Sequence, residues 1–353
     1  MLEGRTYVPL LHARLAEMRA LRELATSTKN VILPVIRIRP WLNAKNLSKA
    51  FDVIEEAFGD RAFGLDLDST KFDPSNQKPA YQEFAALFNE ADGFSNYYDC
   101  VAEKVNRVPV IRRPEGVTPF LDRQLESAKE LERGLVVRVF PDQLGDYIQV
   151  AAACAEKRLE NVVFVVDCGW RMDILTQAAQ CTSIVNNILD VSEDIEVVVA
   201  GSSFPNAFAG MGERGSFQVN ERLLFQNVRQ NINRGLLVYG DWGSTRPPTD
   251  PVPMTNVPRI DTADNTIWMS WRSEAGETYE KVAERVVADP LWTGNTDLWG
   301  NYLIESTAEG LEPAIKAPAM AAAVRVNLHM HTQAHFDNPN NLNIGDEPVG
   351  DDL

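Results

Sequence analysis

Eight short apolar segments recur between residues 7 and 241, and most of them end in a charged or small polar residue. They cover residues 7–11, 31–39, 63–68, 108–113, 134–139, 162–167, 195–202 and 236–241. Several of them are rich in valine and isoleucine with little polar alternation, which is typical of parallel strands buried on both faces. The spacing therefore predicts a parallel sheet with connecting helices.

Stretches with apolar residues at helical spacing separate these segments. They lie near residues 13–26, 45–58, 78–91, 119–133, 142–157, 172–190 and 217–234. Alternating strands and helices indicate either a closed barrel or an open doubly wound sheet. Eight nearly equal units favour an α/β fold of the TIM-like (β/α)8 barrel type, whose functional site lies at the carboxyl ends of the strands.

The C-terminal part leaves one alternative open. Residues 266–271 are also strand-like, so a barrel could omit residues 7–11 and close with this segment instead. We prefer to pair residues 266–271 with residues 257–261 as a β-hairpin outside the barrel. The proline-rich residues 246–253 would then be a linker, and helices are expected near 276–288, 297–310 and 318–335. The predicted organisation is a barrel over 1–246, a C-terminal hairpin with helices packed on it over 247–336, and a disordered acidic tail over 337–353.

The charge and the cysteines narrow the functional classes. A net charge of −16 argues against direct binding to nucleic acid or to an anionic membrane. The sequence contains neither a long apolar run nor a secretion signal, so we expect a cytoplasmic protein without membrane contact. The four cysteines lack zinc-site spacing and the density of a disulfide scaffold, which predicts reduced, buried thiols. Cys168 follows Asp167 at a strand end and is the one whose reactivity should be tested.

Charged residues gather where the predicted strands end. Residues two apart on a strand point to the same face, so Arg37 and Arg39 project together, as do Asp66 and Asp68. Other strand ends contribute Arg112 or Arg113, Arg138, Asp167 and Asp241. One interpretation is a ring of salt bridges that holds the barrel end together. The other is a pocket in which arginines bind an anionic group while carboxylates bind a metal or transfer protons.

Two glycine-containing turns, residues 200–205 and 240–246, follow the seventh and eighth predicted strands. Barrels often bind phosphate with these two loops, although glycine at a tight turn also has a purely conformational explanation. Trp242 lies in the second turn, where an indole could stack on a ligand. The candidate ligand-binding residues are Arg37, Arg39, Arg112, Arg138, Gly201, Ser202, Ser203, Trp242, Gly243 and Ser244.

The carboxylates provide the candidate catalytic residues, Asp66, Asp167 and Asp241, as general bases or metal ligands. Asp66, Asp68 and Asp167 are the candidate metal ligands, and such oxygen donors point to Mg²⁺ as the cofactor. His331 and His335 could share a helical face as a zinc pair, but a solvated or packed helix end is the favoured interpretation. The sequence has neither a GxSxG nucleophile motif nor a strand-end lysine for a Schiff base.

Several segments, taken in order, resemble those of a known family. The most specific are Ala200-Gly-Ser-Ser-Phe-Pro205 and Tyr239-Gly-Asp-Trp-Gly243, and residues 7–11 and 108–112 agree as well. Over nearly its whole length the chain resembles the "beta protein" family of phages and bacteria. This resemblance implies a TIM-barrel-like fold and a link to phage or mobile DNA, with no established reaction. Arg37 stands where we would expect an acidic residue and His12 where a lysine often follows the first strand, so charge-pair chemistry is not carried over at these positions.

Two hypotheses about function follow. The first is a phage- or mobile-element-associated accessory protein, an enzyme or sensor, whose barrel mouth binds a small phosphorylated or nucleotide-like anion, with hydrolysis as its candidate reaction. The alternative is a non-catalytic acidic interaction protein, or a subunit of a defence or counter-defence complex, with a protein partner. Arginines and acids that face one another at the strand ends would favour the first. Acids clustered on a helix-side face would favour the second.

Overall fold

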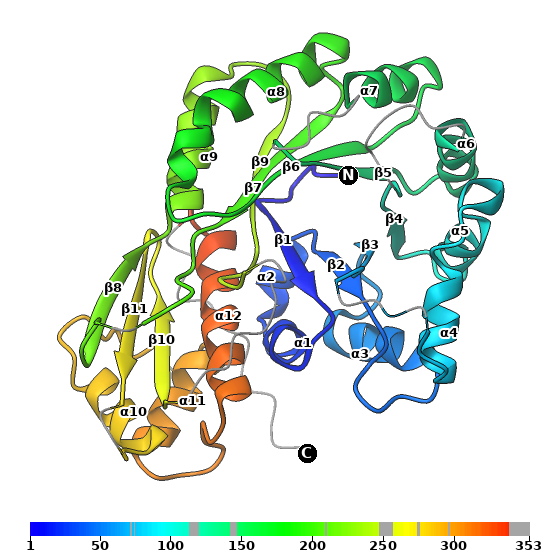
Figure 1. Ribbon diagram of the computed structural model, residues 1–353. Coiled ribbons are helices and arrows are strands. Elements are labelled where there is room, and N and C mark those ends of the chain that lie inside the picture. Colours follow the sequence, from blue (N-terminus) through cyan, green and yellow to red (C-terminus); the bar gives the residue numbers. More distant parts are fainter. Residues whose placement is uncertain are drawn as a thin grey trace.

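The computed structural model describes residues 1–70, 73, 75–112, 120–141, 147–208, 210–246, 257–273, 276–295 and 297–338. Within these residues, eight parallel strands form one sheet in the order β4-β3-β2-β1-β9-β7-β6-β5. The strands are β1 (Tyr7–His12), β2 (Val35–Ile38), β3 (Phe63–Leu67), β4 (Arg107–Pro109), β5 (Leu135–Val139), β6 (Val162–Trp170), β7 (Glu196–Ser202) and β9 (Leu237–Asp241). A parallel bridge between Val110 and Val136 links the β4 edge to β5, so the sheet is nearly closed (Figure 1).

Helices surround this barrel-like sheet, and several of them follow directly on a strand (Figure 1). In chain order they are α1 (Leu15–Arg22), α2 (Thr26–Asn30), α3 (Ser48–Phe58), α4 (Pro79–Ala86), α5 (Ser95–Ala102), α6 (Leu121–Leu131), α7 (Tyr147–Glu156), α8 (Ala178–Val191) and α9 (Asn220–Asn231). Two short 3-10 helices, η1 (Ala91–Gly93) and η2 (Ile174–Gln177), precede α5 and α8. The α/β alternation predicted from the sequence is confirmed, while α5 was not expected.

The strands bury side chains on both faces, and the two faces belong to different cores. In β1, Val8 and Leu10 belong to a cluster of mostly small, branched side chains inside the barrel. Tyr7 and Leu11 belong to the larger cluster between the sheet and the helices. Because successive side chains of a strand point to opposite faces, this alternation decides which strand-end residues face into the barrel.

A second, antiparallel sheet has the order β10-β11-β8. Its strands are β8 (Arg214–Gln218), β10 (Arg259–Ala263) and β11 (Ile267–Arg272). The pairing of β10 with β11 confirms the predicted hairpin. The alternative in which residues 266–271 close the barrel is wrong, because β1 lies between β2 and β9.

Strand β8 occupies the start of a segment that was predicted to be helical from residue 217. Its residues alternate between exposed and half-buried, and they pair with β11. Helix α9 begins only at Asn220. This strand forms because its backbone hydrogen-bonds to a segment distant in the sequence. The local spacing of apolar residues does not reveal such a partner. A strand from within residues 1–246 thus joins the C-terminal sheet.

Three helices follow the second sheet, α10 (Tyr279–Val287), α11 (Trp299–Ala308) and α12 (Pro318–Ala334). Helix α12 is buried along most of its length because it contacts both sheets. Val326 and Met330 pack in the core shared with β1, whereas Val324 and Leu328 pack in the core of the second sheet. Figure 1 shows α12 between β10 and α1. The last predicted helix therefore covers the barrel as well as the C-terminal sheet.

Proline shortens two strands relative to the prediction. Strand β2 begins at Val35, after Pro34, rather than at residue 31. Strand β4 has three residues and ends at Pro109, which has no N–H to donate. The next N–H, of Val110, donates to the hydroxyl of Tyr97 at 2.7 Å instead of to a strand. The predicted linker and acidic tail lie outside the described residues, apart from residues 246, 337 and 338.

The four cysteines are buried and free, as predicted. The Sγ atoms of Cys168 and Cys181 lie 3.0 Å apart. This contact and burial raise the pKa of the Cys168 thiol well above its usual value, which disfavours the reactive thiolate.

None of the described helices combines the length and the apolar character needed to cross a lipid bilayer.

Candidate functional site

One side chain from each strand of the barrel faces inward at the carboxyl end, and together these ends form what we call the mouth. Each lies two residues beyond a residue of the barrel interior, so the alternation of the strands brings them to one place. In chain order they are His12, Arg37, Asp66, Arg112, Arg138, Asp167, Ser202 and Trp242. The sequence correctly predicted that arginines and aspartates gather here, and the structure adds His12.

Four of these residues, Arg138, Asp66, Asp167 and Arg112, are joined by short ion pairs. The two terminal nitrogens of Arg138 lie 2.6 Å from Asp66 Oδ2 and 2.6 Å from Asp167 Oδ2. Arg112 Nη1 lies 2.7 Å from Asp66 Oδ1. Burial alone would raise the pKa of Asp66, but Arg138, Arg112 and Arg37 hold it well below its usual value. Asp66 is therefore a permanent anion that positions arginines, and a poor proton acceptor.

Trp242 forms the floor of the mouth. Its Nε1–H donates to Asp167 Oδ1 at 3.0 Å, and Trp242 is 1% exposed. The guanidinium carbons of Arg138 and Arg37 lie 5.4 Å and 5.8 Å from the centre of the indole ring. Two arginines lie against the buried ring, which disfavours the predicted stacking of Trp242 on a ligand, and that role stays a prediction.

On the other side of the mouth, the charged groups around Asp68 lie farther apart. The Asp68 carboxylate lies 3.7 Å from Arg37 Nη2, 3.8 Å from Arg14 Nη2 and 4.0 Å from Arg39 Nη1. These distances are too long for hydrogen bonds. The side chains of Arg14 and Arg39 are 34% and 41% exposed, so solvent reaches the mouth from this side.

His12 ends β1 and is 1% exposed, yet neither ring nitrogen has a hydrogen-bond partner. Its Nδ1 lies 3.7 Å from Asp68 Oδ2, which also has no hydrogen-bond partner. Burial, together with the charges of Arg14, Arg37, Arg39 and Arg138, lowers the pKa of His12 well below its usual value. The ring is therefore neutral near pH 7 and offers one donor and one acceptor. Strand alternation in residues 8–12 was the signal that could have identified it.

Asp241 does not face the mouth, contrary to the prediction. Because Trp242 takes the inward position, Asp241 points to the helix side of β9. There it accepts hydrogen bonds from the hydroxyls of Tyr7 and Tyr239, and from His329 Nε2 at 2.7 Å. Burial alone would raise its pKa, but His329 and the two tyrosines lower it. Asp241 thus anchors α12 to the barrel, and its position does not suit a general base for a ligand at the mouth.

Trp268 of β11 extends this contact to the second sheet. Its Nε1–H donates to His329 Nδ1 at 3.1 Å. An indole N–H can only donate, so Nδ1 is the acceptor and Nε2 carries the proton that His329 donates to Asp241. All three groups are buried. This chain links β11, α12 and β9, and sequence reasoning did not predict it.

The hydroxyls of the two glycine-containing turns are used by the protein itself. Ser202 donates to the carbonyl of Thr245, and Ser203 donates to the carboxylate of Glu221. Ser244 lies 3.4 Å from Arg325 Nε. A Cβ on Gly201 would lie 2.1 Å from Ile174 Cδ1, so close packing explains this glycine. These contacts favour the conformational interpretation, and a phosphate-binding role for the turns stays a prediction. Arg113 lies outside the described residues.

Metal binding has no preformed centre in the part of the chain that the structure describes. No group of three or more His, Cys, Asp or Glu side chains there could hold an ion. A Mg²⁺ role for Asp66, Asp68 and Asp167 stays a prediction. Arginines already form ion pairs with the carboxylates of Asp66 and Asp167. His331 Nδ1 and His335 Nε2 lie 2.8 Å and 3.0 Å from the Thr28 hydroxyl, so the packed helix end is confirmed.

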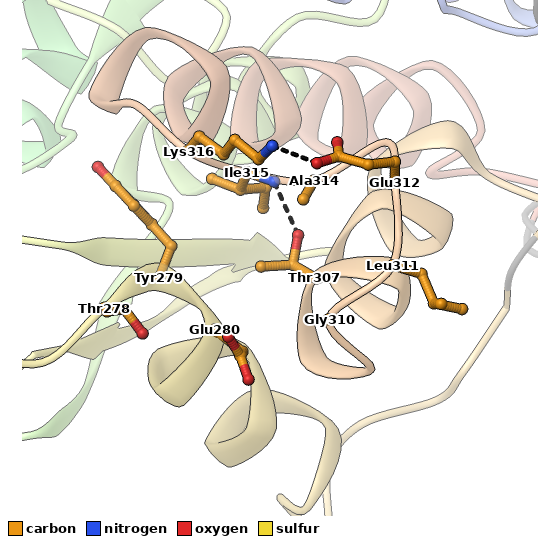
Figure 2. Close-up of a pocket in the computed structure, with 10 residues that line it drawn as sticks. All are labelled: Thr278, Tyr279, Glu280, Thr307, Gly310, Leu311, Glu312, Ala314, Ile315 and Lys316. Carbon is orange, nitrogen blue, oxygen red and sulfur yellow. Dashed lines mark hydrogen bonds and ion pairs between the residues drawn. The ribbon is translucent and has the colours of Figure 1, made fainter.

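A pocket of about 230 Å³ lies away from the mouth, between the start of α10 and the segment that joins α11 to α12 (Figure 2). Its charged lining residues, Glu280, Glu312 and Lys316, are exposed. The Thr307 hydroxyl donates to the carbonyl of Leu303 and accepts from the N–H of Ile315. The pocket is smaller than most ligand sites and has no unsatisfied buried group, so the mouth is the candidate site.

The sequence pattern of the Beta protein family matches residues 7–335. The chain belongs to this family. Protein beta of Enterobacteria phage P4 is 26% identical over 340 residues, which cover 94% of this chain and 93% of the phage protein. The resemblance noted from the sequence is confirmed, and so is the relationship to a phage protein. In this Beta protein family member, the matched region contains His12 and the inward-facing strand ends.

Proposed function

We propose that this Beta protein family member binds a small phosphorylated or nucleotide-like anion at the mouth of a TIM-like (β/α)8 barrel, in which α12 is the eighth covering helix. The observation that carries the proposal is a surplus of positive charge beside unsatisfied polar atoms. Five arginines there face only three aspartates. They are Arg14, Arg37, Arg39, Arg112 and Arg138, against Asp66, Asp68 and Asp167.

Unpaired buried groups support an anionic ligand. The Nε atoms of Arg14, Arg37, Arg112 and Arg138 are buried without a hydrogen-bond partner. A buried donor without a partner destabilises the folded protein, whereas an oxyanion would accept several such bonds. Glu17 of α1 also lies near Arg14 and Arg39, and burial raises its pKa, which weakens it as a competing anion. The charge balance of the mouth therefore favours an anion as the missing partner.

Titration calorimetry with pyrophosphate and AMP at low salt tests this proposal. Arg39→Met should weaken binding by about tenfold or more, because it removes an exposed cation of the mouth. Arg229→Met is the matched control, since the Arg229 side chain is 60% exposed on α9 and its ion pair, with the exposed Asp337, lies away from the mouth. Binding that is absent for both anions, or that is equally affected by the two variants, would refute the proposal.

Hydrolysis of the ligand and a Mg²⁺ cofactor remain parts of the proposal that need their own tests. Asp66 pairs with both Arg112 and Arg138, whereas the ion pair of Asp167 is with Arg138, so we choose Asp167 as the candidate catalytic residue at the mouth. Asp167→Asn should abolish any turnover of a bound ligand while leaving anion binding. A shift of the melting temperature by MgCl₂ that disappears in the same variant would support metal binding.

The net charge of −16 favours the alternative, a non-catalytic acidic interaction protein. The mouth itself has a positive surplus, so the acids that dominate the net charge lie elsewhere on the chain. The two functions make different demands on the arginines. If the protein acts only through an acidic surface, Arg39→Met leaves its biological activity unchanged.

A further inference from the structure

The mouth has two unlike halves. In the closed half, Arg138 and Arg112 hold Asp66 and Asp167 through contacts of 2.6–2.7 Å. In the open half, His12, Arg14, Arg37 and Arg39 surround Asp68 at 3.7–4.0 Å. In the closed half every carboxylate oxygen of Asp66 and Asp167 accepts a hydrogen bond, and only the Nε atoms of Arg112 and Arg138 have none. The open half is where a ligand would improve the hydrogen bonding of the protein.

Asp68 is the unusual member of the open half. Its Oδ1 accepts a hydrogen bond from the N–H of Thr70 at 3.1 Å, whereas Oδ2 has no hydrogen-bond partner. The side chain is 0% exposed. A bare anion bound to Arg14, Arg37 and Arg39 would lie against this carboxylate and be repelled by it. A ligand with its own hydroxyl or amino group would instead donate to Oδ2.

We propose that the open half binds a phosphate monoester that also carries a hydroxyl or amino donor, the class of sugar phosphates and nucleotides. The phosphate lies among Arg14, Arg37 and Arg39, and the donor binds Asp68 Oδ2. His12 contributes one ring nitrogen to each part of the ligand. This inference rests on the proposed anion binding and adds the substrate class and the residue that selects it.

Trp242 limits which part of such a ligand is recognised. The indole lies under Arg37 and Arg138 and is 1% exposed, which disfavours stacking on a nucleobase. The unsatisfied atoms of the open half are both ring nitrogens of His12, the Nε atoms of Arg14 and Arg37, and Asp68 Oδ2. Recognition therefore falls on the phosphate and hydroxyl groups of a sugar phosphate, and any base would extend beyond the mouth.

A matched pair of ligands tests the inference without altering the protein. Ribose 5-phosphate and methyl phosphate are both monoesters, but only the first carries hydroxyl donors. Titration calorimetry should show ribose 5-phosphate binding at least about tenfold more tightly, the ratio expected when a buried carboxylate gains a donor. Equal affinities for the two monoesters would overturn the inference.

Asp68→Asn provides the second test, because the inference predicts that this variant changes the affinities for the two ligands in opposite directions. Removing the charge should weaken ribose 5-phosphate binding and strengthen methyl phosphate binding, so the ratio falls to about threefold or less. Asp99→Asn is the control, since Asp99 is exposed on α5. A ratio that is unchanged in Asp68→Asn overturns the inference. If this variant does not fold, the ligand pair on the unaltered protein decides alone.

Pyrophosphate separates this inference from the proposed function. If pyrophosphate binds but ribose 5-phosphate shows no preference over methyl phosphate, the mouth is an anion site and the assigned role of Asp68 is wrong. If no anion binds, the proposed function fails and this inference fails with it.

Discussion

Replacing Arg138 with methionine tests whether the closed half of the mouth stabilises the barrel. Methionine keeps the straight apolar stem and removes the guanidinium, which lies 2.6 Å from both Asp66 and Asp167. Asp66 would keep Arg112, and Asp167 would keep the N–H of Trp242. The variant breaks two buried ion pairs but leaves each aspartate one other partner, so the free energy of unfolding should fall by about 3–5 kcal/mol, the range for removing one member of a buried pair.

Lys281→Met is the control for this measurement. Lys281 Nζ also lies 2.6 Å from a carboxylate oxygen, that of Glu284, but both side chains are exposed on α10. We expect no measurable change for this variant because water and salt screen exposed pairs. Urea denaturation followed by circular dichroism measures both variants. Similar small changes in the two would refute the argument that burial gives the Arg138 pairs their weight.

The pH dependence gives the same experiment a second readout. Asp66 has a folded-state pKa below its usual value of 3.8, so its ion pairs stabilise the protein at neutral pH and stop doing so as the pH falls below about 4. Removing Arg138 raises this pKa. The difference in unfolding free energy between the unaltered protein and Arg138→Met should be nearly constant from pH 7 to about pH 4 and should shrink as the pH falls below 4. A difference that stays constant below pH 4 would contradict the ion-pair explanation.

Three further predictions concern the barrel and its junction with α12. His329→Ala leaves Asp241 and the N–H of Trp268 without their shared partner. The free energy of unfolding should therefore fall by about 3–5 kcal/mol. A loss under about 1 kcal/mol in chemical denaturation would contradict this role of His329. Burial and Asp241 raise the pKa of Glu221 to about 8, so the unaltered protein loses stability as the pH rises from the usual Glu value toward 8. The glutamine of Glu221→Gln does not titrate. Between pH 5 and pH 9 the free energy of unfolding of this variant should rise by up to about 5 kcal/mol relative to that of the unaltered protein. Parallel stability profiles of the two proteins would count against this explanation. Gly240→Ala places a Cβ 2.6 Å from Val198 Cγ1 and 2.8 Å from the carbonyl oxygen of Val8. Thermal denaturation should therefore show a loss of about 1–3 kcal/mol in the free energy of unfolding. An unchanged melting temperature would refute the packing argument.

Much of the barrel could be predicted because its pattern is local. A strand such as β6 is apolar on both faces wherever it lies in the sheet, and the helix after it has its own spacing of apolar residues. The exceptions depend on distant partners. Strand β8 forms against β11, and α12 is buried on two sides because both sheets contact it. Neither fact is present in the residues of the element itself.

The candidate site divides in the same way. The arginines and aspartates at the strand ends were visible in the sequence, and the alternation within each strand would have brought His12 inward and turned Asp241 outward. The same alternation that places Arg37 and Asp66 inward also operates in β1 and β9. In β9 it gives the inward position to Trp242 rather than to Asp241. The metal and phosphate-loop predictions relied on residue type alone, which says nothing about whether a carboxylate or hydroxyl is already bound.

The sequence by itself determined the rhythm of strands and helices and the end of the sheet at which charge collects, since both follow from side-chain periodicity over a few residues. Only the tertiary structure decided which charges neutralise one another. Arg138 meets an aspartate 72 positions away, and Asp241 meets a histidine 88 positions away. Such pairings depend on how the barrel closes. Closure left Asp68 Oδ2 and both ring nitrogens of His12 buried without hydrogen-bond partners, and this local imbalance is the physical basis for assigning a ligand to the mouth.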